Sequence, residues 1–162
     1  MTRKLLALIA FIALFVPAVR TQAASFQPRP SATATRIVQL VNERRAAAGL
    51  KPLKVNALLM AEAQRFSGVQ AAMGRISHRG TDDTNAGQRL SKAGYRWSFY
   101  GENLAAGQET AQEVVAAWMA SPTHRANVLS PKAREIGIGH TFRADDAHGF
   151  FDYYVMEIGR SR

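Results

Sequence analysis

The sequence contains no cysteine, which excludes two common ways of stabilising a small exported domain. No disulfide can cross-link the chain, and no thiolate zinc site can form. Apolar residues make up 47% of the sequence, so enough of them are present to build a core by packing alone. We therefore expect a single domain whose stability rests on its hydrophobic core.

Long hydrophobic runs are scarce, and the one that exists lies at the start of the chain. Residues 5–19 are apolar, follow the basic pair Arg3–Lys4, and are followed by small residues up to Ala24. This order is typical of a secretory signal peptide. The run is short for a membrane span and contains Pro17. The sequence thus predicts a signal peptide over 1–24, a secreted protein that is extracellular or periplasmic, and no transmembrane segment after cleavage.

Runs of like charge are also missing. The chain has 21 basic and 12 acidic residues, and three of the basic ones, Arg3, Lys4 and Arg20, belong to the predicted signal peptide. The remaining cations are scattered, and the longest basic run after the signal is Arg44–Arg45. A scattered excess favours an ordinary basic surface over attraction to anionic cell-surface polymers, lipid headgroups or nucleic acid. We therefore expect no nucleic-acid partner.

The spacing of apolar residues predicts helices first and strands last. Residues 25–35 are rich in Pro, Ser, Thr and Ala and are predicted to be a linker before a domain over 36–162. Period-two alternation near the end of the chain predicts an antiparallel hairpin. This order without repeated strand–helix–strand units indicates an α+β fold. The predicted helices span residues 34–48, 56–74, 85–93 and 110–121, with a short segment from Pro122, and the predicted strands span 136–141 and 150–158.

Three polar clusters stand at intervals along this amphipathic chain, namely Ser77–Gly80, Gly101–Leu104 and Ser121–Asn127. They contain His78, Glu102 and His124 beside turn-forming residues. Two imidazoles and a carboxylate can hold Zn²⁺ with one position open for water, which metal-assisted hydrolysis requires. The ligands lack the His-Glu-x-x-His spacing of a helical zinc site. A Gly-x-Ser-x-Gly nucleophile motif is absent too, which disfavours covalent catalysis.

The order and spacing of several motifs resemble the CAP superfamily, which includes cysteine-rich secretory proteins, antigen 5 and plant pathogenesis-related proteins. The similarity is greatest to its short bacterial secreted branch and covers residues 36 to 160. Each motif alone is weak, but five in the same order are specific. The matching segments are Leu40–Arg45 with Gly49–Leu50, then Ser77–His78, Gly101–Ala105, Trp118–Asn127 and Glu135–Gly139.

The resemblance implies an α-β-α sandwich in which helices flank a small central antiparallel sheet. It also implies a cleft lined in many members by two histidines and two acids. His78 and Glu102 match the first histidine and the first acid. His124 matches the second histidine, since it stands thirteen residues before Gly137 as in the family. The second acid of the family falls at Ser121 here, so that acid is missing.

Three functions are compatible with these residues. The first is a monomeric binding module whose ligand-binding residues are His78, Glu102 and His124, and whose partner is a small apolar ligand, such as a lipid or sterol, or a cell-surface component. The second is a hydrolase of peptides or cell-wall material that uses Zn²⁺ or another divalent metal, with His78 and His124 as ligands. In the third, the three side chains only hold loops together. Whether the protein is an enzyme stays open.

Several neighbouring residues are assigned other roles. If Ser121 caps the segment that begins at Pro122, His124 lies in its first turn, where the helix dipole favours a neutral imidazole. We expect His140 and His148 to be structural and Trp118 to be part of the core. The aromatic residues before Glu102 either pack in the core or wall an apolar groove, and they are Tyr95, Trp97, Phe99 and Tyr100.

Overall fold

The computed structural model describes residues 31–162. The predicted signal peptide and most of the predicted linker therefore lie outside the described residues. None of the helices within 31–162 combines the length and the apolar character that a membrane crossing requires.

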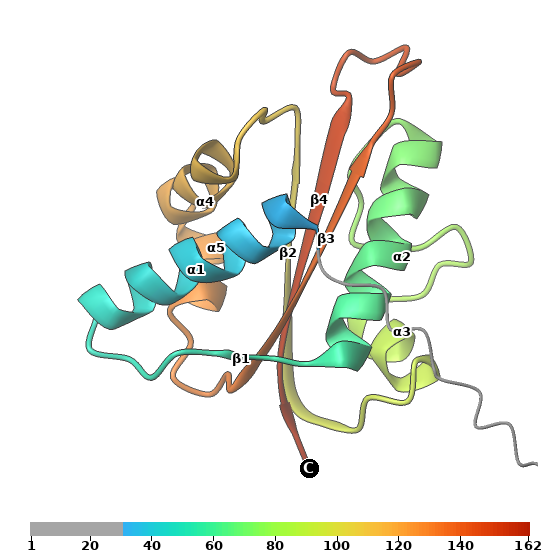
Figure 1. The fold of residues 1–162 in the computed structure, drawn as a ribbon. Helices are drawn as coiled ribbons and strands as arrows, with labels where there is room; N and C mark the ends of the chain where they lie inside the picture. The colour runs from blue at the N-terminus through green and yellow to red at the C-terminus, as the bar shows by residue number, and fades with distance from the viewer. Residues whose placement is uncertain (1–30) are drawn as a thin grey trace, which may run out of the picture.

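The described part of the chain folds into helices and a sheet (Figure 1). The order differs from the predicted helices first and strands last, because a ten-residue strand, Trp97–Ala106, lies between two helices. The elements are α1 (Ala32–Ala47), β1 (Lys54–Val55), α2 (Ala57–Met73), α3 (Ala86–Lys92), β2 (Trp97–Ala106), α4 (Ala111–Ala120), α5 (Pro122–Val128), β3 (Glu135–Phe142) and β4 (Asp152–Ser161).

The sheet is the middle layer of an α-β-α sandwich, as expected. Its strand order is β1-β3-β4-β2, with α2 and α3 on one face and α1, α4 and α5 on the other (Figure 1). The pairs β3–β4 and β2–β4 are antiparallel, whereas the two-residue β1 pairs with β3 in parallel. Both residues of β1 are exposed, so no apolar alternation marked it in the sequence. In the described residues β2 is the last strand on its side of the sheet.

Local sequence signals set the helix boundaries. Asn56 caps α2 by accepting hydrogen bonds from the backbone N–H groups of Leu58 and Leu59. Gly74 ends α2 in the left-handed conformation, which glycine adopts without steric cost. Thr110 begins α4 with a capping box to Glu113.

Two glycines of β3 let α2 lie directly against the sheet. A Cβ atom at Gly137 would stand 2.1 Å from the carbonyl carbon of Leu59, and one at Gly139 would stand 2.0 Å from the carbonyl oxygen of Ala63. These neighbours are backbone atoms and cannot move aside. The alternating glycines are therefore required by close packing of helix on strand, which fixes the position of α2 and of the loop that follows it.

The two faces of the sheet are packed differently. The face covered by α1, α4 and α5 holds one large apolar cluster that includes Ile37, Val114 and Trp118. The face covered by α2 and α3 holds two small apolar clusters and four buried charged residues. Those residues are Glu62, Arg89, Glu102 and Glu157. Buried charges are rare unless paired, so this second face is the candidate location of a functional site.

Candidate functional site

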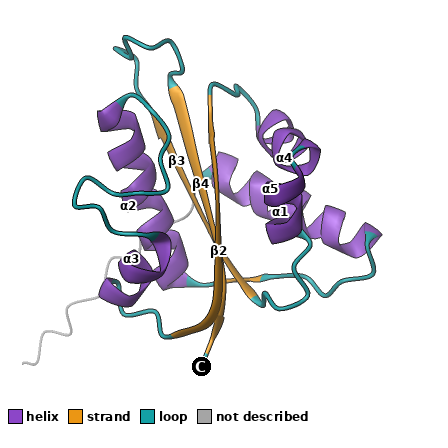
Figure 2. Ribbon diagram, turned by 180° about the vertical axis from the view of Figure 1, so that it is seen from behind, coloured by secondary structure: helices purple, strands orange, loops and turns teal. Residues whose placement is uncertain are grey.

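The site lies at the outer edge of β2, where segments from both helix layers meet (Figure 2). Successive residues of a strand point to opposite faces, and β2 uses both. Glu102 points toward α3, where it contacts Arg89, and Asn103 points toward α5, where its side chain donates to the carbonyl of His124 at 3.0 Å. The loop before α3 brings His78 to the same edge.

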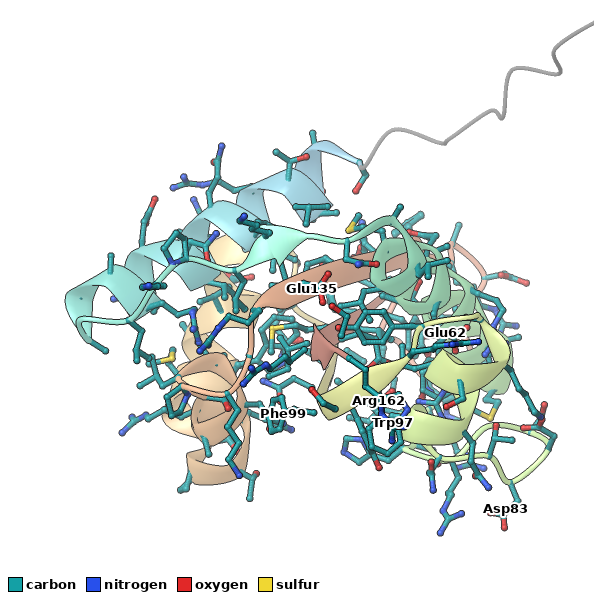
Figure 3. The ribbon with its side chains drawn as sticks, turned by 90° about the horizontal axis from the view of Figure 1, so that it is seen from below. Glu62, Asp83, Trp97, Phe99, Glu135 and Arg162 are labelled. Carbon is teal, nitrogen blue, oxygen red and sulfur yellow. The ribbon has the colours of Figure 1, made fainter. Side chains whose placement is uncertain are left out.

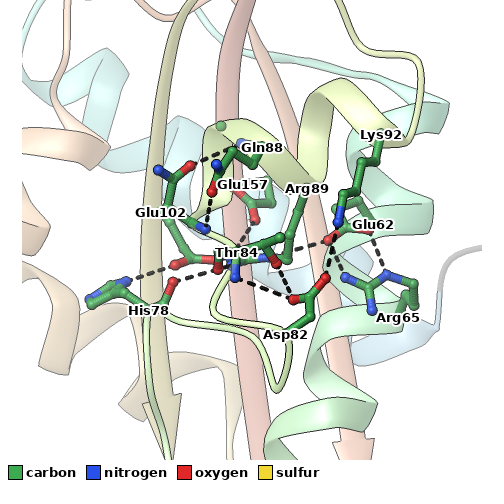
Figure 4. Close-up of polar contacts among 12 residues, drawn as sticks. Glu62, Arg65, His78, Asp82, Thr84, Gln88, Arg89, Lys92, Glu102 and Glu157 are labelled. Atoms are coloured by element: carbon green, nitrogen blue, oxygen red, sulfur yellow. Dashed lines mark hydrogen bonds and ion pairs between the residues drawn. The ribbon is translucent and has the colours of Figure 1, made fainter.

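His78 and Glu102 form the centre of the site (Figure 4). His78 Nδ1 lies 2.7 Å from Glu102 Oε1. The Glu102 side chain is only 3% exposed, whereas that of His78 is 61% exposed. Because Arg89 donates to the other carboxylate oxygen, Oε1 acts as an acceptor and Nδ1 carries the proton. This leaves Nε2 of His78 as the free ring nitrogen. The hydrogen bond to Glu102 also raises the pKa of His78.

Arg89 is the buried cation that holds Glu102 in place. Its guanidinium donates to Glu102 Oε2 and lies 3.3 Å from Glu62 and 3.9 Å from Glu157. It also donates to the backbone carbonyl of His78 at 3.1 Å. The Cζ atom of Arg89 lies 3.5 Å from the ring centre of Phe66, which is a cation–π contact. One side chain of α3 thus connects α2, β2, β4 and the His78 loop.

Glu157 supplies a second acid that the motif comparison did not predict. It lies on β4 and is fully buried beside Glu102 and Arg89. Burial raises the pKa of Glu157 well above its usual range, and the negative charge of Glu102 raises it further. A protonated Glu157 beside an ionised Glu102 avoids placing two negative charges together. The position that the resemblance indicated, Ser121, has only a hydroxyl contact with Thr123 at 3.2 Å.

His124 approaches the site from α5. It is half-buried, and burial, followed by the positive charge of His78, lowers its pKa. His124 therefore favours the neutral form. The side chain of Ser121 makes no capping hydrogen bond, so the neutral form has a different cause from the predicted one. Asn127 fixes α5 by donating to the carbonyl of Glu102 at 3.1 Å.

The residues present offer a metal ion two imidazoles and no free carboxylate. Within 31–162, no group of three or more His, Asp or Glu side chains is arranged to hold a metal. Both oxygens of Glu102 are engaged, one by His78 and one by Arg89. A carboxylate that accepts from the far nitrogen of a histidine is the usual partner of a metal-bound imidazole. Glu102 is therefore placed to orient His78 and not to coordinate.

The structure locates the remaining histidines and the core tryptophan where the sequence predicted them. His140 Nε2 lies 2.6 Å from Asp152 Oδ1, and its ring stacks on Tyr154. His148 lies in the loop between β3 and β4. Trp118 is 1% exposed and donates its indole N–H to the carbonyl of Leu104.

The aromatic cluster before Glu102 divides between the core and the surface. Tyr95 is buried, whereas Trp97 and Tyr100 pack edge to face at 4.7 Å and line a hollow of about 480 Å³ against α3. We call this the Trp97 hollow. Tyr100 and Glu102 lie two residues apart on β2 and so face the same layer. Thr84, whose carbonyl accepts from Arg89, also lines this hollow.

Three buried charged residues of the site, Glu62, Arg89 and Glu157, were missed by sequence reasoning. Glu157 stands in the middle of the apolar strand segment between Met156 and Ile158. A charged residue in a strand that is apolar on both sides is a signal of a buried pair, and this signal could have been used. Arg89 lies next to Leu90 on a short helix and has no comparable mark.

The α-β-α sandwich and the histidine–carboxylate pair at the edge of β2 define the class of the protein. The sequence model of the cysteine-rich secretory protein family, abbreviated CAP, matches residues 38–157. The chain belongs to this family, although it contains no cysteine itself.

Bacterial proteins are among its relatives. The uncharacterised protein YkwD of Bacillus subtilis is 34% identical over 110 residues, which cover 68% of this chain and 43% of YkwD. The chain therefore spans less than half of the curated relative that it matches.

Solved structures share the fold. An outer surface protein of Borrelia burgdorferi aligns with a TM-score of 0.72 and 23% identity, over 79% of this chain and 92% of that one. An extracellular SCP-domain protein of Bacillus anthracis aligns with a TM-score of 0.70 and 22% identity, over 80% of this chain and 40% of that one.

Proposed function

We propose that this chain is a binding domain that acts outside the cytoplasm, and that its ligand is held at the imidazoles of His78 and His124. One observation supports this most: the exposed imidazole of His78 is anchored on a carboxylate that a buried arginine holds in place. A buried ion pair is expensive to desolvate and contributes little net stability. The network that contains Arg89 reaches solvent at His78, so its benefit is to orient that ring.

The two histidines offer different chemistry to a ligand. His78 has a raised pKa and gives a hydrogen bond from its ring when protonated, whereas His124 has a lowered pKa and accepts one. A ligand with a polar head that both donates and accepts hydrogen bonds matches this pair. Alcohol and carboxylic acid groups have that property, and they are the polar ends of sterols and fatty acids.

The Trp97 hollow supports a small ligand with an apolar part. It is walled by Trp97 and Tyr100, and Tyr100 faces the same layer as Glu102. Aromatic walls beside a few polar groups are typical of small-molecule sites. We propose that the polar head of the ligand lies at His78 and that its apolar part extends toward Trp97.

Binding is favoured over covalent hydrolysis because neither serine near the site is placed as a nucleophile. Ser77 Oγ accepts from the backbone N–H of Arg79, and Ser121 Oγ pairs with Thr123. In the described chain, neither hydroxyl is hydrogen-bonded to an imidazole. A serine nucleophile needs such a base beside it.

A divalent metal is the second candidate, supported by the hydrogen bond between Glu102 and Nδ1 of His78. His78 Nε2 and a ring nitrogen of His124 would hold the ion, and Glu102 would fix the tautomer of His78. A bound Zn²⁺ would supply an acidic water, the requirement for a hydrolase of peptides or cell-wall material. Two protein ligands are fewer than the three of most catalytic zinc sites, which disfavours this candidate.

Titration calorimetry with Zn²⁺ and fluorescence titration with a fluorescent sterol and a fluorescent fatty acid separate the two candidates. We compare the wild type with His78→Ala plus His124→Ala, using His148→Ala as the histidine control. Loss of lipid binding in the double variant alone, with unchanged melting temperature, supports the binding domain. Loss of Zn²⁺ binding alone supports the metal site. If the double variant only lowers the melting temperature, the three side chains merely hold loops and both candidates fail.

A further inference from the structure

One end of the sheet carries exposed cations that have no acidic partner. It is the end where β1, β2 and β3 begin and β4 stops, and Figure 3 looks onto it, with Phe99, Glu135 and Arg162 labelled. We call it the basic end. Its six exposed cations are Lys54, Arg96, Lys132, Arg134, Arg160 and Arg162. None of the six is within ion-pair distance of a carboxylate of residues 31–162.

The strand register brings several of these cations together. Glu135 pairs with Gly159, so Arg134 lies opposite Arg160, and the backbone N–H of Arg162 donates to the carbonyl of Arg96 at 2.9 Å. Lys54 pairs with Glu135, so its side chain leaves the sheet on the other face from that of Arg134. Neighbouring strands lie about 4.8 Å apart, so the cations at the ends of β3, β4 and β2 extend over about 10 Å.

A hollow of about 570 Å³ opens within the basic end. It is lined by Lys132, Arg160 and Arg162, by the hydroxyl-bearing Ser98 and Ser161, and by the ring of Phe99. Arg162 uses only Nε inside the protein, to donate to the carbonyl of Trp97. The side chains of Lys132 and Arg160 make no hydrogen bond to the described residues, so three cationic heads are free for an anion.

One acid, Glu135, lies at this end. It accepts from the hydroxyl of Tyr95 at 2.6 Å, from Asn56 Nδ2 at 2.7 Å and from the backbone N–H of Ser161 at 3.1 Å. These donors are neutral, so the carboxylate keeps its negative charge, but a single negative charge offsets only part of that of the six cations.

We propose that the basic end binds a linear, phosphate-bearing polyanion of the cell surface. An extended chain with repeated anionic groups matches cations at the ends of three neighbouring strands, and the hollow takes one such group between Lys132, Arg160 and Arg162. This surface shares no residue with the site of His78, Glu102 and His124, so the proposal goes beyond the ligand bound there.

A lipid membrane fits this end less well. Membrane surfaces are bound by cations together with apolar groups that insert beside them. The three exposed phenylalanines, Phe142, Phe150 and Phe151, lie at the hairpin between β3 and β4, at the opposite end of the sheet. Phe99, the aromatic ring of the basic end, is only partly exposed.

The test measures binding of the purified protein to inorganic polyphosphate of defined length by fluorescence anisotropy. The variant is Lys132→Gln, Arg160→Gln and Arg162→Gln together. The matched control removes three exposed cations from other elements, Arg36→Gln, Arg75→Gln and Lys92→Gln. We expect the first triple variant to bind about tenfold or more weakly and the control to stay within about twofold to threefold of the wild type. Wild-type affinity should fall steeply with added salt.

Three results would overturn the proposal. Equal weakening in both triple variants would mean that only total charge matters. Binding to phosphatidylglycerol vesicles without binding to polyphosphate would assign the surface to a membrane. Absence of polyphosphate binding at low salt would remove the site altogether. His78→Ala should leave polyphosphate binding unchanged, which keeps this test separate from that of the imidazole site.

Discussion

The two helix layers bury different kinds of residue against the same sheet. The layer of α1, α4 and α5 covers a continuous apolar cluster, whereas the layer of α2 and α3 encloses Glu62, Arg89, Glu102 and Glu157. Apolar burial stabilises a fold directly, and buried charge does so poorly. One layer therefore stabilises the domain, and the other positions the ring of His78.

The sharpest way to test this division is to remove the buried cation. Arg89→Met should lower the free energy of unfolding by about 3–5 kcal/mol, because Glu62, Glu102 and Glu157 lose their shared partner. Urea denaturation measures the change. The matched control is Arg65→Met, which removes only the exposed partner of Glu62 and should cost less than about 1 kcal/mol. Similar losses in the two variants would refute a special role for Arg89.

A substitution in the apolar layer should affect stability without affecting the site. Leu40→Ala on α1 should cost about 2–4 kcal/mol through a cavity in the apolar cluster. The NMR resonances of the His78 ring should not move, whereas in Arg89→Met they should. If Leu40→Ala shifted the His78 resonances as strongly, the two layers would not be independent.

The effect of Glu157→Gln on stability should depend on pH. The folded state raises the pKa of Glu157 above its unfolded value. Stability is therefore highest below the unfolded pKa of about 4.3 and is lost as pH rises toward and through the folded pKa. The variant cannot ionise, so at pH 8 it should be more stable than the wild type, and at pH 4 the two should be about equally stable.

Thermal melting at the two pH values measures this difference. The exposed Glu109→Gln serves as the control and should show no pH-dependent gain. A gain of the same size at pH 4 and pH 8 would show that Glu157 does not carry a raised pKa.

Local signals made much of the fold predictable. Asn56, Gly74 and the Thr110–Glu113 box end or begin helices through contacts within a few residues, so the sequence alone indicated them. The strand β1 could not be predicted because it exists only by pairing with β3, and Lys54 and Val55 carry no pattern of their own.

The site was predictable only in part. The motifs named His78, Glu102 and His124, and the structure brings His78 and Glu102 into contact, while their role as ligand-binding or metal-binding residues stays a prediction. Arg89 and Glu157 were not predicted, because α3 and β4 are far apart in the sequence and meet only in the folded structure. Gly137 and Gly139 belong to a motif that the sequence shows. The reason for these glycines is the close approach of α2, which only the three-dimensional structure reveals.

The central claim is that Glu102 holds the ring of His78 with its proton on Nδ1 and its Nε2 free for a ligand. The most direct measurement is the tautomer of His78 by long-range ¹⁵N–¹H correlation NMR, at a pH where the ring is neutral. We expect the Nδ1–H tautomer of His78 in the wild type, and we expect this tautomer to be lost in Glu102→Leu. A wild-type ring protonated on Nε2 would contradict it.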